Sequence, residues 1–296
     1  MRIILIFLVF ISCGDTGKIL PPSKGQNSEV VFVVNDDLWF HSIDSLASIT
    51  FGESIAGVNQ IESLFKIIQI NHGQFNSVLK KHRNIVIISE GSTTSRQRNK
   101  WAEGQFVAQL NWQHNTNKFL KELMELRLVF TKKELNSLRI SFEKSSNKDI
   151  EKSVLNNFDV KLIIPQEYQN IINDSTFFWA SHNPVNSDEI KNILVFSFIP
   201  KNTNLQQQIL LKTDSMFKKH LDGRKEGTYV RIEPEYPPHY FEEVYRGLWK
   251  LENGFMGGPF IIKTYFVKQK VVVCVGMVFA PQNRKRKYIK EFEAIL

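Results

Sequence analysis

The histidines and cysteines of this chain are spaced too widely to predict a local metal or nucleophilic site. The chain holds seven histidines and two cysteines. No two histidines stand three or four residues apart, the spacing that places both on one face of a helix, and there is no Cys-x-x-Cys pair. A P-loop, a Gly-x-Ser-x-Gly elbow and a His-Glu-x-x-His helix are also missing. We therefore assign no catalytic residue, metal or cofactor from the sequence, and a site assembled from distant residues stays open.

Cys13 ends a short amino-terminal segment that is typical of an exported lipoprotein precursor. Arg2 precedes an unbroken apolar run over residues 3–11. That run would span about 14 Å as a helix, whereas a hydrocarbon core needs about 20 residues, so residues 1–12 are predicted to be a signal peptide. Ser12 supplies the small residue that precedes the cysteine at a lipoprotein cleavage site. We expect lipid on Cys13, whose acyl chains would anchor the protein to a membrane; secretion without lipid is the alternative.

Cys274 lies in an apolar run, Val271-Val272-Val273-Cys274-Val275, which is typical of a buried strand. If Cys13 carries lipid, Cys274 has no partner for a disulfide within the chain. The sequence therefore predicts a buried and chemically inert thiol that packs as a small apolar side chain.

The composition and element pattern predict a tethered protein of two lobes. Residues 13–28 hold the lipidated cysteine and a stretch rich in Gly, Pro and Ser, which is typical of a flexible tether. Residues 145–149 are the best linker, so we place one lobe at 29–145 and the other at 146–296. Both halves mix strands with amphipathic helices, and several neighbouring strands resemble hairpins. The predicted class is α+β with mainly antiparallel sheets and packed helices, and a loose similarity of the two lobes is a further hypothesis.

Two polar segments follow apolar runs that we expect to form strands. Asn35, Asp36 and Asp37 come directly after the run 30–34, and we expect them to cap a helix, although carboxylates at a strand end also occur in active sites. The segment 91–96, Gly-Ser-Thr-Thr-Ser-Arg, follows a second apolar run. Its backbone N–H groups could cradle an anion, but we favour a mobile loop.

The chain is basic, and four of its cations are consecutive. Its formal net charge is +8, which favours anionic partners such as lipid or cell-wall polymer; nucleic acid is not expected for an exported chain. The consecutive residues are Arg284, Lys285, Arg286 and Lys287. They follow Asn283, the expected cap of a last helix at 283–295, although a helix N-terminus disfavours cations. We interpret them either as a solvated helix end or as an anion-binding site for lipid phosphate or cell-wall carboxylate.

Two tryptophans and two glycines are candidates for a ligand or partner surface. Trp39 and Trp249 stand near charged residues and could stack on a sugar, although burial in a core is the favoured interpretation. Gly257 and Gly258 precede Pro259, which predicts a tight turn with positive φ where another segment passes closely. The alternative is a rim at which a ligand approaches the backbone.

Several strings together resemble one known family. In the carboxyl-terminal half they are Gly247-Leu248-Trp249, Phe255-Met256-Gly257-Gly258-Pro259-Phe260, Val278-Phe279-Ala280-Pro281, Lys285-Arg286-Lys287-Tyr288 and Glu293-Ala294-Ile295-Leu296. In the amino-terminal half they are Gln69-Ile70-Asn71, Gln74-Phe75, His82-Arg83-Asn84-Ile85 and Trp101-Ala102. The chain resembles a family of Bacteroidota lipoproteins catalogued as domain of unknown function 4837, over about residues 29–296. The resemblance implies location in the envelope and an α+β fold, but no activity and no catalytic residues.

Taken together, these features predict a lipid-anchored protein of the cell envelope. We expect it on the inner or outer membrane, facing the periplasm rather than the cell surface, with a non-enzymatic binding or scaffold role. Its partner would be an envelope protein or a cell-wall polymer. The alternative is a cell-wall-active hydrolase or accessory enzyme with a discontinuous site. A concave pocket of converging titratable groups with perturbed pKa values would favour an enzyme, and an exposed apolar patch would favour a scaffold.

Overall fold

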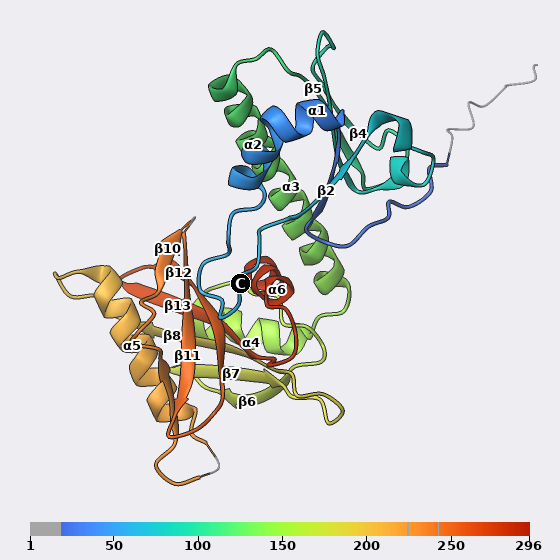
Figure 1. Cartoon of the computed structure of the whole chain (residues 1–296). Coiled ribbons are helices and arrows are strands. Elements are labelled where there is room, and N and C mark those ends of the chain that lie inside the picture. Colours follow the sequence, from blue (N-terminus) through green and yellow to red (C-terminus); the bar gives the residue numbers. More distant parts are fainter. Residues whose placement is uncertain (1–18, 224, 242) are drawn as a thin grey trace, which may run out of the picture.

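The computed structural model describes residues 19–223, 225–241 and 243–296, which form two lobes (Figure 1). The class is α+β with sheets rich in antiparallel pairs, as predicted. Among the described residues, no helix is both long and apolar enough to cross a membrane. Cys13 and the predicted signal peptide lie outside the described residues.

The amino-terminal lobe is built on a five-stranded sheet that is mostly parallel. Its strands are β1 (Glu29–Val33), β2 (Lys66–Ile70), β3 (Asn84–Ser89), β4 (Ser95–Arg98) and β5 (Phe106–Asn111). The strand order is β2-β1-β3-β5-β4, and only β4 runs against its neighbour. Every residue of β1 is buried, as expected for a central parallel strand covered on both faces.

Helices cover one face of this sheet. They are α1 (Asp36–Leu38), a π-helical turn η1 (Trp39–Ile43), α2 (Asp44–Thr50) and the long α3 (Thr116–Lys144), and two short 3₁₀ turns, η2 (His72–Gln74) and η3 (Leu79–Lys81), lie elsewhere in the lobe. Phe51 and Phe65 pack edge to face with ring centroids 5.5 Å apart, and Phe130 of α3 lies against both rings. This aromatic cluster holds the helices on the sheet, because such pairs add to the free energy of apolar burial.

The carboxyl-terminal lobe is an antiparallel sheet with helices on both faces. Its strands are β6 (Gln169–Asn173), β7 (Phe177–His182), β8 (Ile190–Phe198), β9 (Tyr229–Ile232), β10 (His239–Phe241), β11 (Val244–Glu252), β12 (Gly257–Val267) and β13 (Lys270–Phe279). The order is β10-β11-β12-β13-β8-β7-β6, with β9 also paired to β11. Helix α5 (Leu205–His220) packs on one face, and α4 (Lys148–Phe158) and α6 (Arg286–Ile295) pack on the other. The two lobes therefore share no sheet topology.

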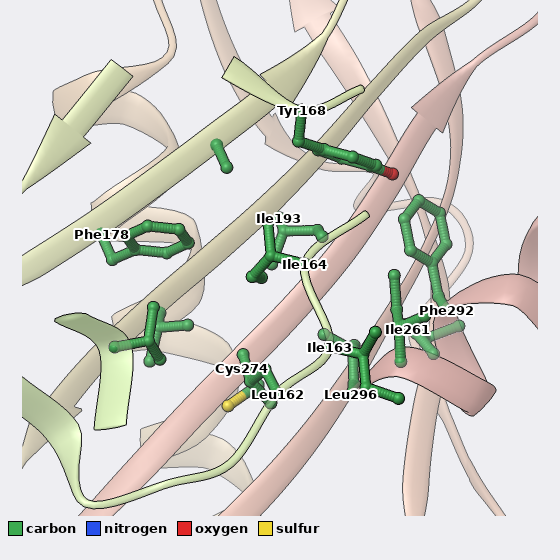
Figure 2. Packing of buried hydrophobic residues seen from close by; sticks show 14 of the residues in the cluster. Leu162, Ile163, Ile164, Tyr168, Phe178, Ile193, Ile261, Cys274, Phe292 and Leu296 are labelled. Atoms are coloured by element: carbon green, nitrogen blue, oxygen red, sulfur yellow. The ribbon is translucent and has the colours of Figure 1, made fainter. Parts of the chain in front are cut away.

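Cys274 lies in the core on the face of this sheet that α4 and α6 cover. Figure 2 shows its sulfur among apolar side chains, with Leu162 beside it. The side chain is fully buried and free, as predicted for an inert thiol. Burial raises the pKa of the thiol to about 12, so the reactive thiolate does not form near neutral pH.

The two lobes interlock rather than meeting at a simple linker. The connection from α2 to β2 descends to the second lobe, where Ile55 joins the core beneath the sheet (Figure 1). Helix α3 packs against α6, and Glu134 of α3 forms a buried ion pair with Lys290 of α6. Each lobe therefore completes the packing of the other.

The described part of the predicted tether lies against the first lobe. Pro22 forms a β-bridge with Glu103 and Lys24 forms one with His82. Ser28 is buried, and its backbone N–H donates to the carboxylate of Glu134. The Gly, Pro and Ser content predicted flexibility, but backbone pairing holds residues 22–24 along the lobe.

Candidate ligand-binding cleft

The topology of the first lobe brings four strand ends to one edge. Strands β1, β2, β3 and β5 are parallel, so their carboxyl ends meet there. From β1 the chain moves outward to β2, and it then crosses back to β3 on the other side of β1. In open α/β sheets, ligands bind beyond the carboxyl ends of the strands at this kind of reversal. The segments after β1 and β3 are therefore the place to look for a site.

A cleft of about 770 Å³ lies at this edge. Its lining comes from segments that follow three of the parallel strands and from the first helical turns. The polar lining residues include Asn35, Asp37, His41, Glu90, Trp112 and His114. The residues are up to 79 positions apart in the sequence, from 35 to 114, so only the strand order brings them together.

The π-helical turn η1 shapes one wall of the cleft. Its side chains point to two sides: Trp39 and Ile43 enter the core, whereas His41 lines the cleft. Nδ1 of His41 lies 2.9 Å from the backbone oxygen of Asp37. A carbonyl oxygen only accepts, so Nδ1 is the donor in this contact. Single π-helical turns are frequent at functional sites.

The two aspartates after β1 have different roles. Asp36 accepts from the side-chain amides of Gln69 at 2.9 Å and Asn71 at 3.2 Å, which ties the end of β1 to the end of β2. Asp37 lines the cleft. Asn35 is the N-cap residue of α1 without a side-chain capping bond. The prediction that these side chains cap the helix is therefore wrong, since the neighbouring strand end competes for Asp36.

Trp112 lines the cleft and carries a buried, unpaired donor. Its ring packs edge to face on Phe119 with centroids 5.1 Å apart, and the side chain is almost fully buried. Among the described residues, its indole Nε1 has no hydrogen-bond partner. An unsatisfied buried donor costs about 1–3 kcal/mol. A ligand oxygen that reached this N–H would recover part of that free energy.

The opposite wall carries an exposed histidine–carboxylate contact. Nε2 of His114 lies 3.3 Å from a carboxylate oxygen of Glu90, and both side chains are mostly exposed to solvent. Such a pair contributes little to folding stability, so both groups can turn toward a ligand at small cost. Within the described parts of the chain, no three His, Cys, Asp or Glu side chains converge as metal ligands.

The tryptophans singled out in the sequence are core residues. Trp39 is buried in the first lobe, with its ring centroid 5.6 Å from that of Phe32. Trp249 is buried in the second lobe, and its Nε1 donates to the backbone oxygen of Val278 at 3.2 Å. Neither indole offers a surface for a ligand or a partner, so the core interpretation applies to both.

Gly257 and Gly258 belong to strand β12 rather than to a turn. Neither has positive φ, so that prediction is wrong; the turn before them contains Asn253, whose φ is 57°. A Cβ on Gly258 would lie 2.1 Å from the backbone oxygen of Val278. These glycines therefore allow a close approach of chain segments, and that part of the prediction is confirmed. They also border a shallow cleft beside the exposed ring of Phe255.

The basic cluster at the start of α6 is partly used inside the protein. Lys285, not Asn283, is the N-cap residue, and its buried ammonium donates to the backbone oxygen of Ala280. The backbone N–H groups of Lys285 and Arg286 donate to the carboxylate of Glu62. The carboxylate of Glu62 thus occupies the position at this helix end where an external anion would bind.

The remaining cations of the cluster lie at the lobe junction. Arg284, Arg286 and Lys287 line a pocket of about 330 Å³ together with Asn27 and Lys290. Lys287 also lies 3.7 Å from a carboxylate oxygen of Glu189. The predicted site of four free cations therefore does not form, because Lys285 turns inward.

Comparison with known proteins now identifies the family. Residues 147–296 match the family described as Domain of unknown function (DUF4837). The chain belongs to this family. Residues 23–143 match a second family, described as Domain of unknown function (DUF8532). The resemblance seen in the amino-terminal half thus corresponds to a separate family.

No protein with a curated description matches the chain. Among solved structures, the human StarD13 (DLC2) lipid transfer and protein localization domain is similar over 44% of this chain and 89% of that domain, with 6% identity. The TM-score is 0.21, so this likeness supports no inference about fold or function.

Proposed function

We propose that this protein is a lipid-anchored binding protein of the cell envelope, which holds a small polar ligand in the cleft at the carboxyl edge of its first lobe. The observation that carries this proposal is a cleft at the strand reversal, lined by polar residues and by Trp112, whose buried N–H has no partner among the described residues. Cofactor and ligand sites of open α/β sheets occur at this position.

The lining indicates a ligand rich in hydroxyl or amino groups. Asp37 and Glu90 supply carboxylate acceptors, and His41 presents its imidazole to the cleft. Acidic groups stand out here in a chain whose formal charge is +8. Amino sugars, the repeating units of cell-wall polymers, combine several donors with an apolar ring face. A protein that binds such units would suit the envelope location that the lipoprotein signal predicts.

Anchoring through Cys13 is the second part of the proposal. Its support is the apolar run 3–11 followed by Ser12 and Cys13. Mass spectrometry of the mature protein from membranes should find acyl chains on an amino-terminal Cys13. Cys13→Ser should yield a precursor that is not acylated. Acylated Cys13→Ser protein, or mature wild-type protein without lipid, would contradict the anchoring.

The ligand proposal is tested by titration calorimetry with glucose, glucosamine and putrescine as probes, which separate hydroxyl from amine recognition. We expect saturable binding of at least one probe. Asp37→Asn should weaken it about tenfold or more, because hydrogen bonds to charged groups contribute about 1.5–3 kcal/mol. Trp112→Phe should weaken it as well, since it removes the unpaired N–H and keeps the ring.

Asp188→Asn is the matched control, because Asp188 is exposed in the second lobe and the change alters the charge equally. The control should bind as the parent does. Lack of binding by every probe, or equal binding by Asp37→Asn and the control, would reject the cleft as the site. Steady conversion of a bound probe to product would favour the enzymatic alternative.

A further inference from the structure

The opposite edge of the same sheet carries a basic surface. Residues 63–89 and 91–102 contain seven Lys and Arg residues and no Asp or Glu. The cations at this amino edge are Lys24, Lys80, Lys81, Arg83, Arg98 and Lys100, and we call them the amino-edge surface. They belong to segments that lead into β1, β3 and β5 or to the end of β4. Since β3 and β5 are parallel, this surface lies at the end of the sheet opposite to the cleft.

The amino-edge surface has an indole at its centre. The ammonium of Lys100 lies 4.6 Å from the ring centroid of Trp101, and that of Lys80 lies 5.9 Å from the same ring. Val78 is 64% exposed on the neighbouring segment. A tryptophan flanked by lysines and an exposed apolar side chain is the composition of a membrane–water interface, where the indole sits at headgroup level and ammonium groups meet phosphates.

Nearby acids do not neutralise this surface. Glu29 is largely buried and is paired with Lys66 at 3.3 Å and with His82 at 3.5 Å. Glu103 is exposed at the edge, where six cations outnumber it. The pKa of Lys133 is lowered to about 8, chiefly by burial and further by the charges of Arg83 and Arg98. A positive potential therefore prevails at this edge.

The chain enters the lobe beside the amino-edge surface. Pro22 pairs with Glu103, next to Trp101, and Lys24 pairs with His82, next to Lys81. Cys13 and Pro22 are nine positions apart, which corresponds to at most about 30 Å of extended chain. A lipid on Cys13 would therefore keep this edge within about 30 Å of the bilayer.

We propose that the amino-edge surface docks on the anionic phospholipid headgroups of the membrane that holds Cys13, with Trp101 at headgroup level. This inference rests on the anchoring proposed above. Docking would turn the ligand cleft away from the membrane, because the two edges lie at opposite ends of parallel strands. The lipid then supplies permanent attachment, and the amino-edge surface supplies orientation.

The test uses the mature chain without its lipid, residues 14–296, which keeps every described element. Its partition is measured by sedimentation with vesicles of phosphatidylcholine alone and with one third phosphatidylglycerol. We expect binding only to the anionic vesicles, and a decline as salt is raised. Lys24→Glu with Lys100→Glu should lower the partition coefficient by about tenfold or more. Both side chains are exposed, so the fold should persist.

The matched control is Lys212→Glu with Lys219→Glu on the exposed face of α5, which changes the net charge equally on the other lobe. The control should bind within about threefold of the parent, because distant charges are screened. An equal loss in both double variants, or equal binding to neutral and anionic vesicles, would overturn the proposal. Because this protein carries no lipid, the result is independent of whether Cys13 is acylated.

Discussion

The two lobes use charged side chains in opposite ways. In the second lobe, charges pair inside the structure: Arg246 binds Glu293, and the ammonium of Lys191 lies within 3.8 Å of three glutamates. In the first lobe, acids line a cleft at one sheet edge and cations gather at the other. Parallel strands give a sheet two chemically distinct edges, whereas antiparallel strands mix both kinds of strand end at each edge. The first lobe is therefore the place where recognition is expected, and the second lobe is a packed support.

The largest loss of folding stability is expected at the contact between the two lobes. Glu134→Met leaves the buried ammonium of Lys290 without its partner, which should cost about 3–5 kcal/mol in the free energy of unfolding. Urea unfolding followed by fluorescence and circular dichroism measures the loss. The double variant with Lys290→Met should recover part of it, because the buried N–H of Ser28 still lacks its acceptor. Glu143→Met breaks the exposed pair with Arg139 on the same helix and should cost less than about 0.5 kcal/mol.

The same unfolding measurement also tests whether the lobes are one folding unit. Interlocked lobes should unfold in one transition, with the two probes giving the same midpoint. Two separate transitions in the wild-type protein would show that the lobes unfold independently, as two domains.

Gly258 of the second lobe should matter for stability, whereas Gly73 of the first lobe should not. Gly258→Ala places a Cβ 2.1 Å from a backbone oxygen of β13, which should cost about 2–3 kcal/mol through overpacking. Gly73→Ala in the first lobe meets no atom within 4 Å and should change stability by less than about 0.5 kcal/mol. Thermal unfolding of both variants measures the contrast. Similar melting temperatures would remove the packing explanation for Gly258.

Glu62 should stabilise α6 from the other lobe. Glu62→Ala removes the acceptor of two backbone N–H groups at the helix start and should cost about 1–2 kcal/mol. Glu62→Gln keeps an acceptor oxygen but loses the charge, so the loss should be smaller. Chemical unfolding ranks the variants. A larger loss for Gln than for Ala would show that the carboxylate is not acting as a cap.

The smallest effect is expected at Cys274. Cys274→Ala should cost about 1 kcal/mol, because it removes one atom from a packed core. The native thiol should resist iodoacetamide at pH 8 and react after unfolding. Its pKa is about 12 in the folded protein against 9.0 for an ordinary thiol, so stability should fall as pH rises from about 9 toward 12. Cys274→Ala should lack that component, and rapid alkylation of folded protein would contradict the burial.

Local patterns predicted some features well and others poorly. The apolar run around Cys274 predicted a buried strand, because burial on both faces leaves a continuous apolar sequence. The glycines before Pro259 indicated a close approach but not the positive φ expected of a turn. The cluster 284–287 suggested free cations, since nothing local shows that Glu62, more than two hundred residues away, reaches Lys285.

The sequence by itself determined the α+β class, the family and the buried thiol, because each depends on composition or on neighbouring residues, and it predicts the export signal on which the anchoring proposal rests. Only the tertiary structure decided which strand ends share an edge. Asp37, Glu90 and Trp112 each follow a different strand, and the order β2-β1-β3-β5-β4 alone places them around one cleft. The same order sends the cations to the opposite edge. Strand order arises from contacts between distant segments, and no local pattern in a single sequence encodes those contacts.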